Sequence, residues 1–212
     1  YQYVSLLSKE DGPMLIDFSK SQHQMIDCSL KSGEFILINS MADRSLAQSE
    51  YNIRVSQCKE GLKLINTKLG CSKKIYEIDH GDLDCLDRSS IHFLRLRHVV
   101  SENQRVLKMR SAIKEENITK MGALLNKSHQ SLSKYYEVSC DEIESIIGVS
   151  SLAPGFFGGR IMGGGFGGCT LNLVDVASRR EFESYMKDRL VGDHGLTVKL
   201  ERIQFSSGLK NH

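Results

Sequence analysis

The 212-residue sequence contains no tryptophan, only two prolines and no long uncharged apolar run. No stretch approaches the roughly 18 apolar residues of a membrane span, and the N-terminus lacks the basic-then-apolar pattern of a signal peptide. The 28 basic and 26 acidic residues nearly cancel, so bulk charge does not predict binding to nucleic acid or to an acidic membrane. We therefore expect a soluble, cytoplasmic protein without a nucleic-acid or membrane partner.

The six cysteines and seven histidines are scattered along the chain. No two cysteines lie within four residues of each other, and there is no His-x-x-x-His pair. These spacings exclude the common zinc motifs, so we expect no metal held by protein side chains. We also expect the thiols to be reduced and mostly buried.

Short apolar runs separated by turn residues predict strands in the first forty residues. The predicted strands are Val4–Leu7, Met14–Phe18, Gln24–Cys28 and Phe35–Asn39. Apolar side chains then recur at alternating spacings of four and three from Tyr51 to Ile65, which predicts an amphipathic helix that ends near Gly70.

Residues 82–150 contain no proline and little glycine, which is typical of helices. The predicted helices are about Ser90–Lys114, Ile118–Lys134 and Cys140–Ile147. The first carries five basic residues between Arg95 and Arg110. They could bind phosphate, but a solvated helix face is the interpretation that we favour.

The composition changes after Pro154, because eight of the eighteen glycines fall between Gly155 and Gly168. A strand (Leu171–Val174), a helix (Ala177–Leu190) and an alternating strand (Thr197–Phe205) follow. Because the helices cluster in the middle of the chain, the pattern predicts an α+β fold rather than a doubly wound parallel sheet.

The glycine-rich segment runs from Gly158 to Thr170. Such a density of glycine costs backbone entropy and indicates that the backbone must do something special. One use is an anion-binding concavity of backbone N–H groups; the other is a tight turn or close strand packing. No Gly-Lys-Ser/Thr follows, and a strand rather than a helix comes next, so the segment fits neither a P-loop nor a Rossmann turn.

Four separated segments resemble, in order, the galactokinase members of the GHMP small-molecule kinases. They are Asn39-Ser40 with Ser45–Arg54 and Cys58, Arg97–Asn103, Ser128–Leu132 with Tyr136–Cys140, and Arg160–Thr170. The resemblance spans Gln2 to about Val174. It implies the two-layer α+β C-terminal domain of these kinases, an antiparallel sheet packed against helices. It also implies that the intact enzyme uses ATP and Mg2+ to convert galactose to galactose 1-phosphate.

The resemblance also assigns positions in the site. Tyr1 occupies the place of the catalytic Asp, and a phenol with a pKa of about 10 is a poor substitute for a carboxylate at neutral pH. Tyr51 matches a residue that contacts the sugar, although its place on the apolar stripe also allows a core role. The motif that packs beside the phosphate loop comprises Gly163, Gly164, Gly165, Phe166, Gly167 and Gly168.

The family's sugar motif and serine-rich phosphate loop precede this point and are absent from the 212 residues, as is the catalytic Asp. We therefore expect an inactive chain that binds neither ATP nor Mg2+ tightly, with no catalytic or metal-binding residue of its own. Residues 1–22 are expected to be the edge of the N-terminal domain, 23–196 the C-terminal domain, and 197–212 a strand that docks on the missing domain. The chain opens at Tyr1 without an initiator Met, as a fragment does, and should expose apolar surface where that domain docks.

Two other functions remain open. Galactokinase-like proteins can act as non-catalytic sugar sensors, which Tyr1 favours, and a kinase for a related sugar such as N-acetylgalactosamine would share these motifs. A nucleic-acid binder that uses the Arg95–Arg110 helix is disfavoured by the near-zero net charge.

Overall fold

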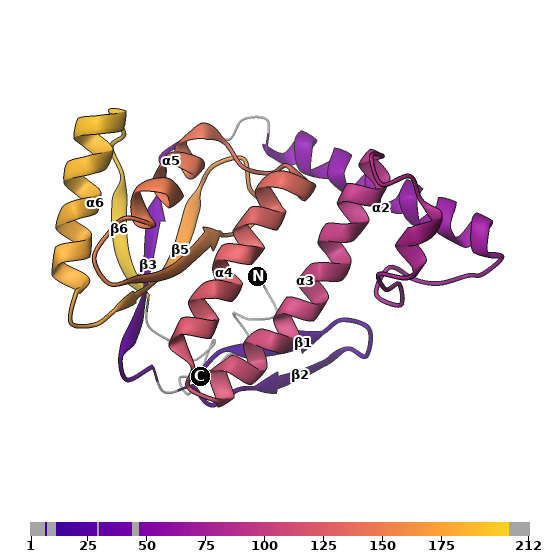
Figure 1. The fold of residues 1–212 in the computed structure, drawn as a ribbon, viewed down its shortest axis with the longest axis horizontal. Helices are drawn as coiled ribbons and strands as arrows, with labels where there is room; N and C mark the ends of the chain where they lie inside the picture. Colours follow the sequence, from indigo (N-terminus) through magenta and orange to yellow (C-terminus); the bar gives the residue numbers. More distant parts are fainter. Residues whose placement is uncertain (1–6, 8–11, 29, 44–46, 204–212) are drawn as a thin grey trace, which may run out of the picture.

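The computed structural model describes residues 7, 12–28, 30–43 and 47–203. Tyr1, most of the predicted strand Val4–Leu7 and the end of the last predicted strand lie outside the described residues. Within them, four antiparallel strands form a sheet in the order β4-β5-β3-β6 (Figure 1). The strands are β3 (Gly33–Asn39), β4 (Phe156–Ile161), β5 (Cys169–Asp175) and β6 (Lys199–Ile203).

One face of this sheet is covered by the helices α5 (Asp141–Ser150) and α6 (Arg179–His194). Because side chains alternate along a strand, Ile36 and Ile38 both point to this face, where they are fully buried with Phe182. The result is the α+β fold with an antiparallel sheet packed against helices that the sequence predicts.

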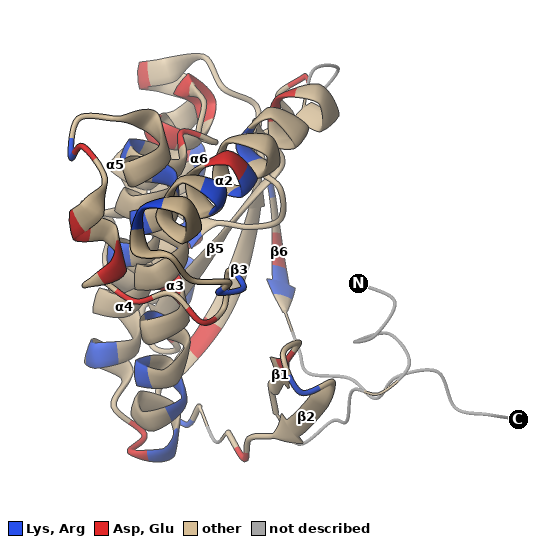
Figure 2. Ribbon diagram, turned by 90° about the vertical axis from the view of Figure 1, so that its right-hand side faces the viewer, with Lys and Arg blue, Asp and Glu red and all other residues tan. Residues whose placement is uncertain are grey.

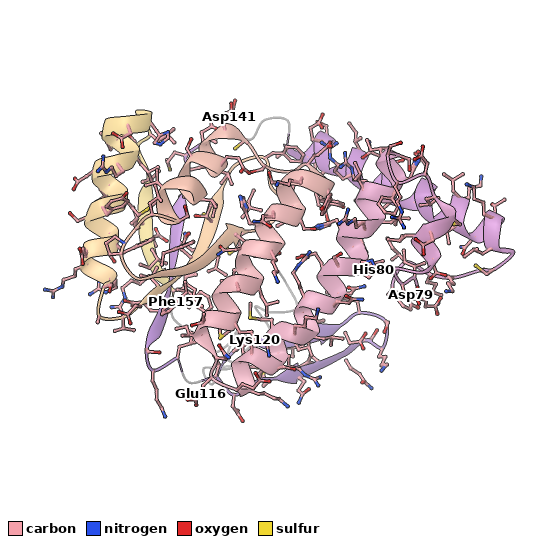
Figure 3. All side chains as sticks on the ribbon, viewed as in Figure 1. Asp79, His80, Glu116, Lys120, Asp141 and Phe157 are labelled. Carbon is pink, nitrogen blue, oxygen red and sulfur yellow. The ribbon has the colours of Figure 1, made fainter. Side chains whose placement is uncertain are left out.

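Three further helices continue away from the β4 edge: α4 (Ile118–Ser131), α3 (Ile91–Lys114) and α2 (Ala47–Leu69). The contact between α4 and β4 is a backbone contact, because a Cβ at Gly122 or at Gly158 would overlap the main chain on the other side. Phe157, labelled in Figure 3, lies at this junction. Glycine is therefore required at both positions by the close approach of helix and strand.

A separate hairpin is formed by β1 (Met14–Asp17) and β2 (Gln22–Met25). It lies on the opposite side of the molecule from α5 and α6 (Figure 2). Leu15 and Ile26 pack into a core shared with α3 and α4. The hairpin thus contacts the helices, and β6 pairs with β3. It stays a prediction that residues 1–22 and 197–212 also contact another domain.

Several boundaries differ from those predicted. Helix α4 ends at Ser131 and is followed by a π-helical turn, η2 (Leu132–Tyr136), whereas α5 continues to Ser150 and α6 to His194. A short 3-10 helix, η1 (Asp82–Cys85), follows α2. All six cysteines are free, but the expectation of mostly buried thiols is wrong: Cys58 is buried and the other five are partly exposed.

No helix in the described part of the chain is long and apolar enough to cross a membrane. Acidic and basic side chains are interspersed over the helices (Figure 2). The described residues nevertheless expose large apolar side chains, including Phe18, Met41 and Leu152.

Candidate functional site

The glycine-rich segment forms the loop that joins β4 to β5. The N–H of Met162 donates to the carbonyl of Cys169 at 2.8 Å, and the N–H of Ser40 donates to the carbonyl of Gly168 at 2.8 Å. Positive φ angles between 57° and 103° occur at Gly163, Gly165, Phe166, Gly167 and Gly168. Glycine supplies this left-handed backbone without a steric penalty, so the tight-turn interpretation holds for the loop.

The loop is attached to the segment that follows η2. The N–H of Phe166 donates to the carbonyl of Val138 at 2.7 Å, and a Cβ at Gly165 would lie only 2.6 Å from the Val138 Cβ. By contrast, the amides of Gly163 and Gly164 donate to no other described residue. A bound anion could therefore accept hydrogen bonds from these two N–H groups.

Tyr51 lies beside this loop near the start of α2. Its ring carbon Cδ2 lies 3.7 Å from where a Cβ on Gly164 would stand, and the residue is 40% exposed. This exposure excludes the alternative that Tyr51 is a core residue. The structure therefore brings the predicted sugar-contacting side chain and the glycine loop to one place.

Arg54 connects α2 to both η2 and the loop. Its Nε donates to the carbonyl of Tyr136 at 2.9 Å, and its Nη2 donates to the carbonyl of Glu137 at 3.0 Å. The guanidinium also lies over the Phe166 ring, 5.6 Å from the centroid. Because Arg54 is one turn from Tyr51, these contacts hold the Tyr51 backbone in register with the loop.

Arg95 is fully buried, which corrects the expectation that the basic side chains of α3 form a solvated face. It donates to Gln57 Oε1 at 2.8 Å, to the Tyr135 carbonyl at 2.5 Å and to Glu137 Oε2 at 2.6 Å. A buried guanidinium is stable only when its donors are matched in this way. The burial of Arg95 could not be predicted from the sequence, because nothing local to α3 distinguishes this residue from its solvated neighbours.

His98 lies in the same layer and is also buried. Its Nδ1 lies 2.9 Å from Ser131 Oγ, and its ring stacks on Tyr136 with centroids 4.5 Å apart. Burial, helped by the nearby Arg105 and Arg160 charges, lowers the pKa of His98 to about 3. The imidazole is therefore neutral near pH 7 and cannot act there as a cationic group.

Glu102 on α3 joins three elements. Its Oε2 accepts from Ser128 Oγ on α4 at 2.6 Å and from Arg160 Nη1 on β4 at 3.4 Å, and its Oε1 accepts from Arg105 Nη1. Glu102 lies in the Arg97–Asn103 segment that resembles galactokinases, but the sequence alone predicts no role for it. Its carboxylate holds α3, α4 and β4 together beside the glycine loop.

Among the described residues, no group of three or more His, Cys, Asp or Glu side chains is placed to hold a metal ion. Tyr1, which stands where the resemblance expects the catalytic Asp, lies outside the described residues. The described part of the candidate site thus consists of the glycine loop and the Tyr51 phenol beside it.

Comparisons with known proteins show what the chain is similar to. The GHMP kinases C-terminal family matches residues 109–191. Galactokinase from Thermosipho africanus is 31% identical over 208 residues, covering 98% of this chain and 57% of that protein. Galactokinase from Bos taurus is 31% identical over 192 residues, covering 90% of this chain and 48% of that protein. The chain thus spans about half the length of the curated relatives it matches.

Solved structures show the same relationship. Lactococcus lactis galactokinase, solved in complex with galactose, superposes with a TM-score of 0.88 at 27% identity, over 95% of this chain and 53% of that one. Leishmania (L. major) mevalonate kinase shares the fold at 14% identity, with a TM-score of 0.59 over 92% of this chain and 50% of that one. Residues 109–191 thus match the C-terminal domain of the GHMP kinases, and the chain along nearly its whole length is similar to the C-terminal portion of galactokinases.

Proposed function

We propose that this chain is the C-terminal part of a galactokinase, and that the intact protein transfers the γ-phosphoryl group of ATP to the anomeric hydroxyl of galactose. The observation that carries the proposal is the position of the Tyr51 phenol beside Gly164, next to two backbone amides, those of Gly163 and Gly164, that donate to no other described residue. The similarity to a galactokinase that binds galactose supports the same substrate.

In this reaction the chain contributes positioning. Tyr51, which is partly exposed, contacts the sugar through its hydroxyl, and Arg54 keeps it in register with the glycine loop. The amides of Gly163 and Gly164 face the phosphates and offset part of their charge. Phosphoryl transfer depends mostly on such positioning and charge stabilisation, since little covalent chemistry falls to the protein.

ATP fits the loop because two amides in a concave, glycine-rich turn suit a phosphate oxygen. No group of three or more His, Cys, Asp or Glu side chains among the described residues is placed to hold magnesium. The serine-rich phosphate loop, the sugar motif and the catalytic Asp that the resemblance implies are absent from these 212 residues. The isolated chain is therefore expected to be inactive.

The test compares the isolated chain with the whole protein that contains it. Each is incubated with ATP, Mg2+ and galactose, and galactose 1-phosphate is measured. Product from the whole protein only is the expected result. Turnover by the isolated chain would contradict its inactivity, and galactose binding without turnover by the whole protein would favour a sugar sensor. Faster turnover of N-acetylgalactosamine would identify a kinase for a related sugar.

A matched pair of variants tests the role of Tyr51 in the whole protein. Tyr51→Phe removes only the hydroxyl and should lower kcat/KM for galactose by about tenfold while leaving KM for ATP unchanged. Tyr76→Phe is the control, because Tyr76 is similarly exposed at 45% but lies beyond the far end of α2. Equal kinetics for the two variants would remove Tyr51 from the sugar site.

A further inference from the structure

A cavity of about 300 Å3 lies between the β1–β2 hairpin and α3, with α4 and β5 completing its walls. Figure 1 shows the hairpin passing beside the lower half of α3. Its apolar walls include Leu15 and Ile26 from the hairpin, and Met109 and Ile113 from α3. This volume and lining are in the range of small-molecule sites in proteins.

The charged groups that line the cavity are unbalanced. Three arginines, Arg105, Arg110 and Arg160, share it with one carboxylate, Glu102. Both oxygens of Glu102 are already occupied by Arg105, Arg160 and Ser128. Arg110 forms no ion pair with any residue that the structure describes. The described lining therefore carries a net charge of +2, and Arg110 is its one arginine without an ion pair among the described residues.

The Arg105 and Arg160 charges are also poorly hydrated. Burial lowers the pKa of the Arg105 and Arg160 guanidinium groups, and Arg160 lowers that of Arg105 further. Guanidinium groups in this situation are stabilised by a second anion, which they bind through paired N–H donors. A fully hydrated inorganic ion would leave the apolar walls empty.

We propose that this cavity binds an organic anion, a carboxylate or phosphate head on an apolar body. The head lies against Arg110 and Arg105, and the body lies between the hairpin and α3. The proposal does not depend on the kinase reaction, because Arg105 and Arg110, which face the head, lie on α3. Arg160 and Met162 of the lining belong to the glycine-rich segment, so the cavity adjoins the candidate site.

Isothermal titration of the 212-residue chain with three ten-carbon probes tests the proposal. Decanoate and decyl phosphate should each bind with a stoichiometry of one, and uncharged decanol should bind at least about tenfold more weakly. The tighter of the two anions identifies the preferred head group. Equal affinity for decanol and both anions, or no binding of either anion, would overturn the proposal.

Two pairs of variants locate the binding. Arg110→Gln should weaken anion binding by about tenfold, whereas Lys108→Gln removes the same charge from an exposed position of α3 and should not change it. Val106→Trp fills the lining of the cavity and should weaken binding of the anions and of decanol alike; Val191→Trp, on exposed α6, should not. Circular dichroism checks that each variant is folded. Equal effects within either pair would contradict the assignment to this cavity.

Discussion

The stability of this chain should fall steeply in mild acid because of His98. The residue is 7% exposed, lies within hydrogen-bond distance of Ser131 and stacks on Tyr136, so burial disfavours its cationic form, and it forms no ion pair with any described carboxylate. Its pKa falls from 6.5 to about 3, with burial as the main cause. Protonation is therefore easier in the unfolded chain than in the folded one.

The direction follows from that difference. Above pH 6.5 both states carry a neutral imidazole and His98 imposes no pH dependence; as the pH falls below 6.5, the unfolded chain takes up the proton first and the folded state loses stability. The loss continues until the pH reaches the folded pKa of about 3. Between pH 7 and pH 5 it amounts to about 2 kcal/mol, at roughly 1.4 kcal/mol per unit of pKa difference.

The measurement is urea unfolding of the chain at pH 7 and at pH 5. His98→Gln removes the titrating group, so its loss of unfolding free energy between the two pH values should be about 2 kcal/mol smaller than that of the wild type. The constant cost of the lost stacking cancels, because each variant is compared with itself. His80→Gln, at an exposed position labelled in Figure 3, is the control. If His98→Gln loses as much stability as the wild type, the reasoning is refuted.

Two further substitutions test the packing around the site. Arg95→Met removes the donors to Gln57, to the Tyr135 carbonyl and to the half-exposed Glu137, and should lower the free energy of unfolding by about 2 to 3 kcal/mol in urea; an unchanged midpoint would show that these hydrogen bonds add nothing. Gly165→Ala meets Val138 with a positive φ of 85° and should cost about 1 to 3 kcal/mol. Gly192→Ala, in open space on α6, should instead raise the thermal midpoint, since alanine favours helix; similar shifts for the two glycine variants would contradict the strain argument.

Local patterns predict the elements of the fold well. The alternating spacing from Tyr51 to Ile65 predicts α2, and the positive φ angles at the β4–β5 turn explain why glycine is concentrated there. Helix ends are less well predicted. The π-helical turn after Ser131 has no sequence signal, because its carbonyls are held by Arg54 and Arg95 from other helices.

Local sequence patterns do not predict contacts between residues that lie far apart in the chain. Arg95 reads as a solvated residue, and only acceptors about forty residues away along the chain make its burial possible. Tyr51 reads equally well as core or as surface until the position of Gly164 is known. The cavity lined by Arg105, Arg110 and Arg160 likewise arises only when β4 and the hairpin lie against α3.

The sequence by itself determined the resemblance to the GHMP kinases, the order of helices and strands, and the need for glycine in one loop, because motifs, periodicity and backbone freedom are properties of neighbouring residues. The tertiary structure alone decided that Arg95 is buried, that Tyr51 lies beside the glycine loop and that a cavity remains between the hairpin and α3. Those features depend on the distances between side chains far apart in the chain, and packing sets these distances.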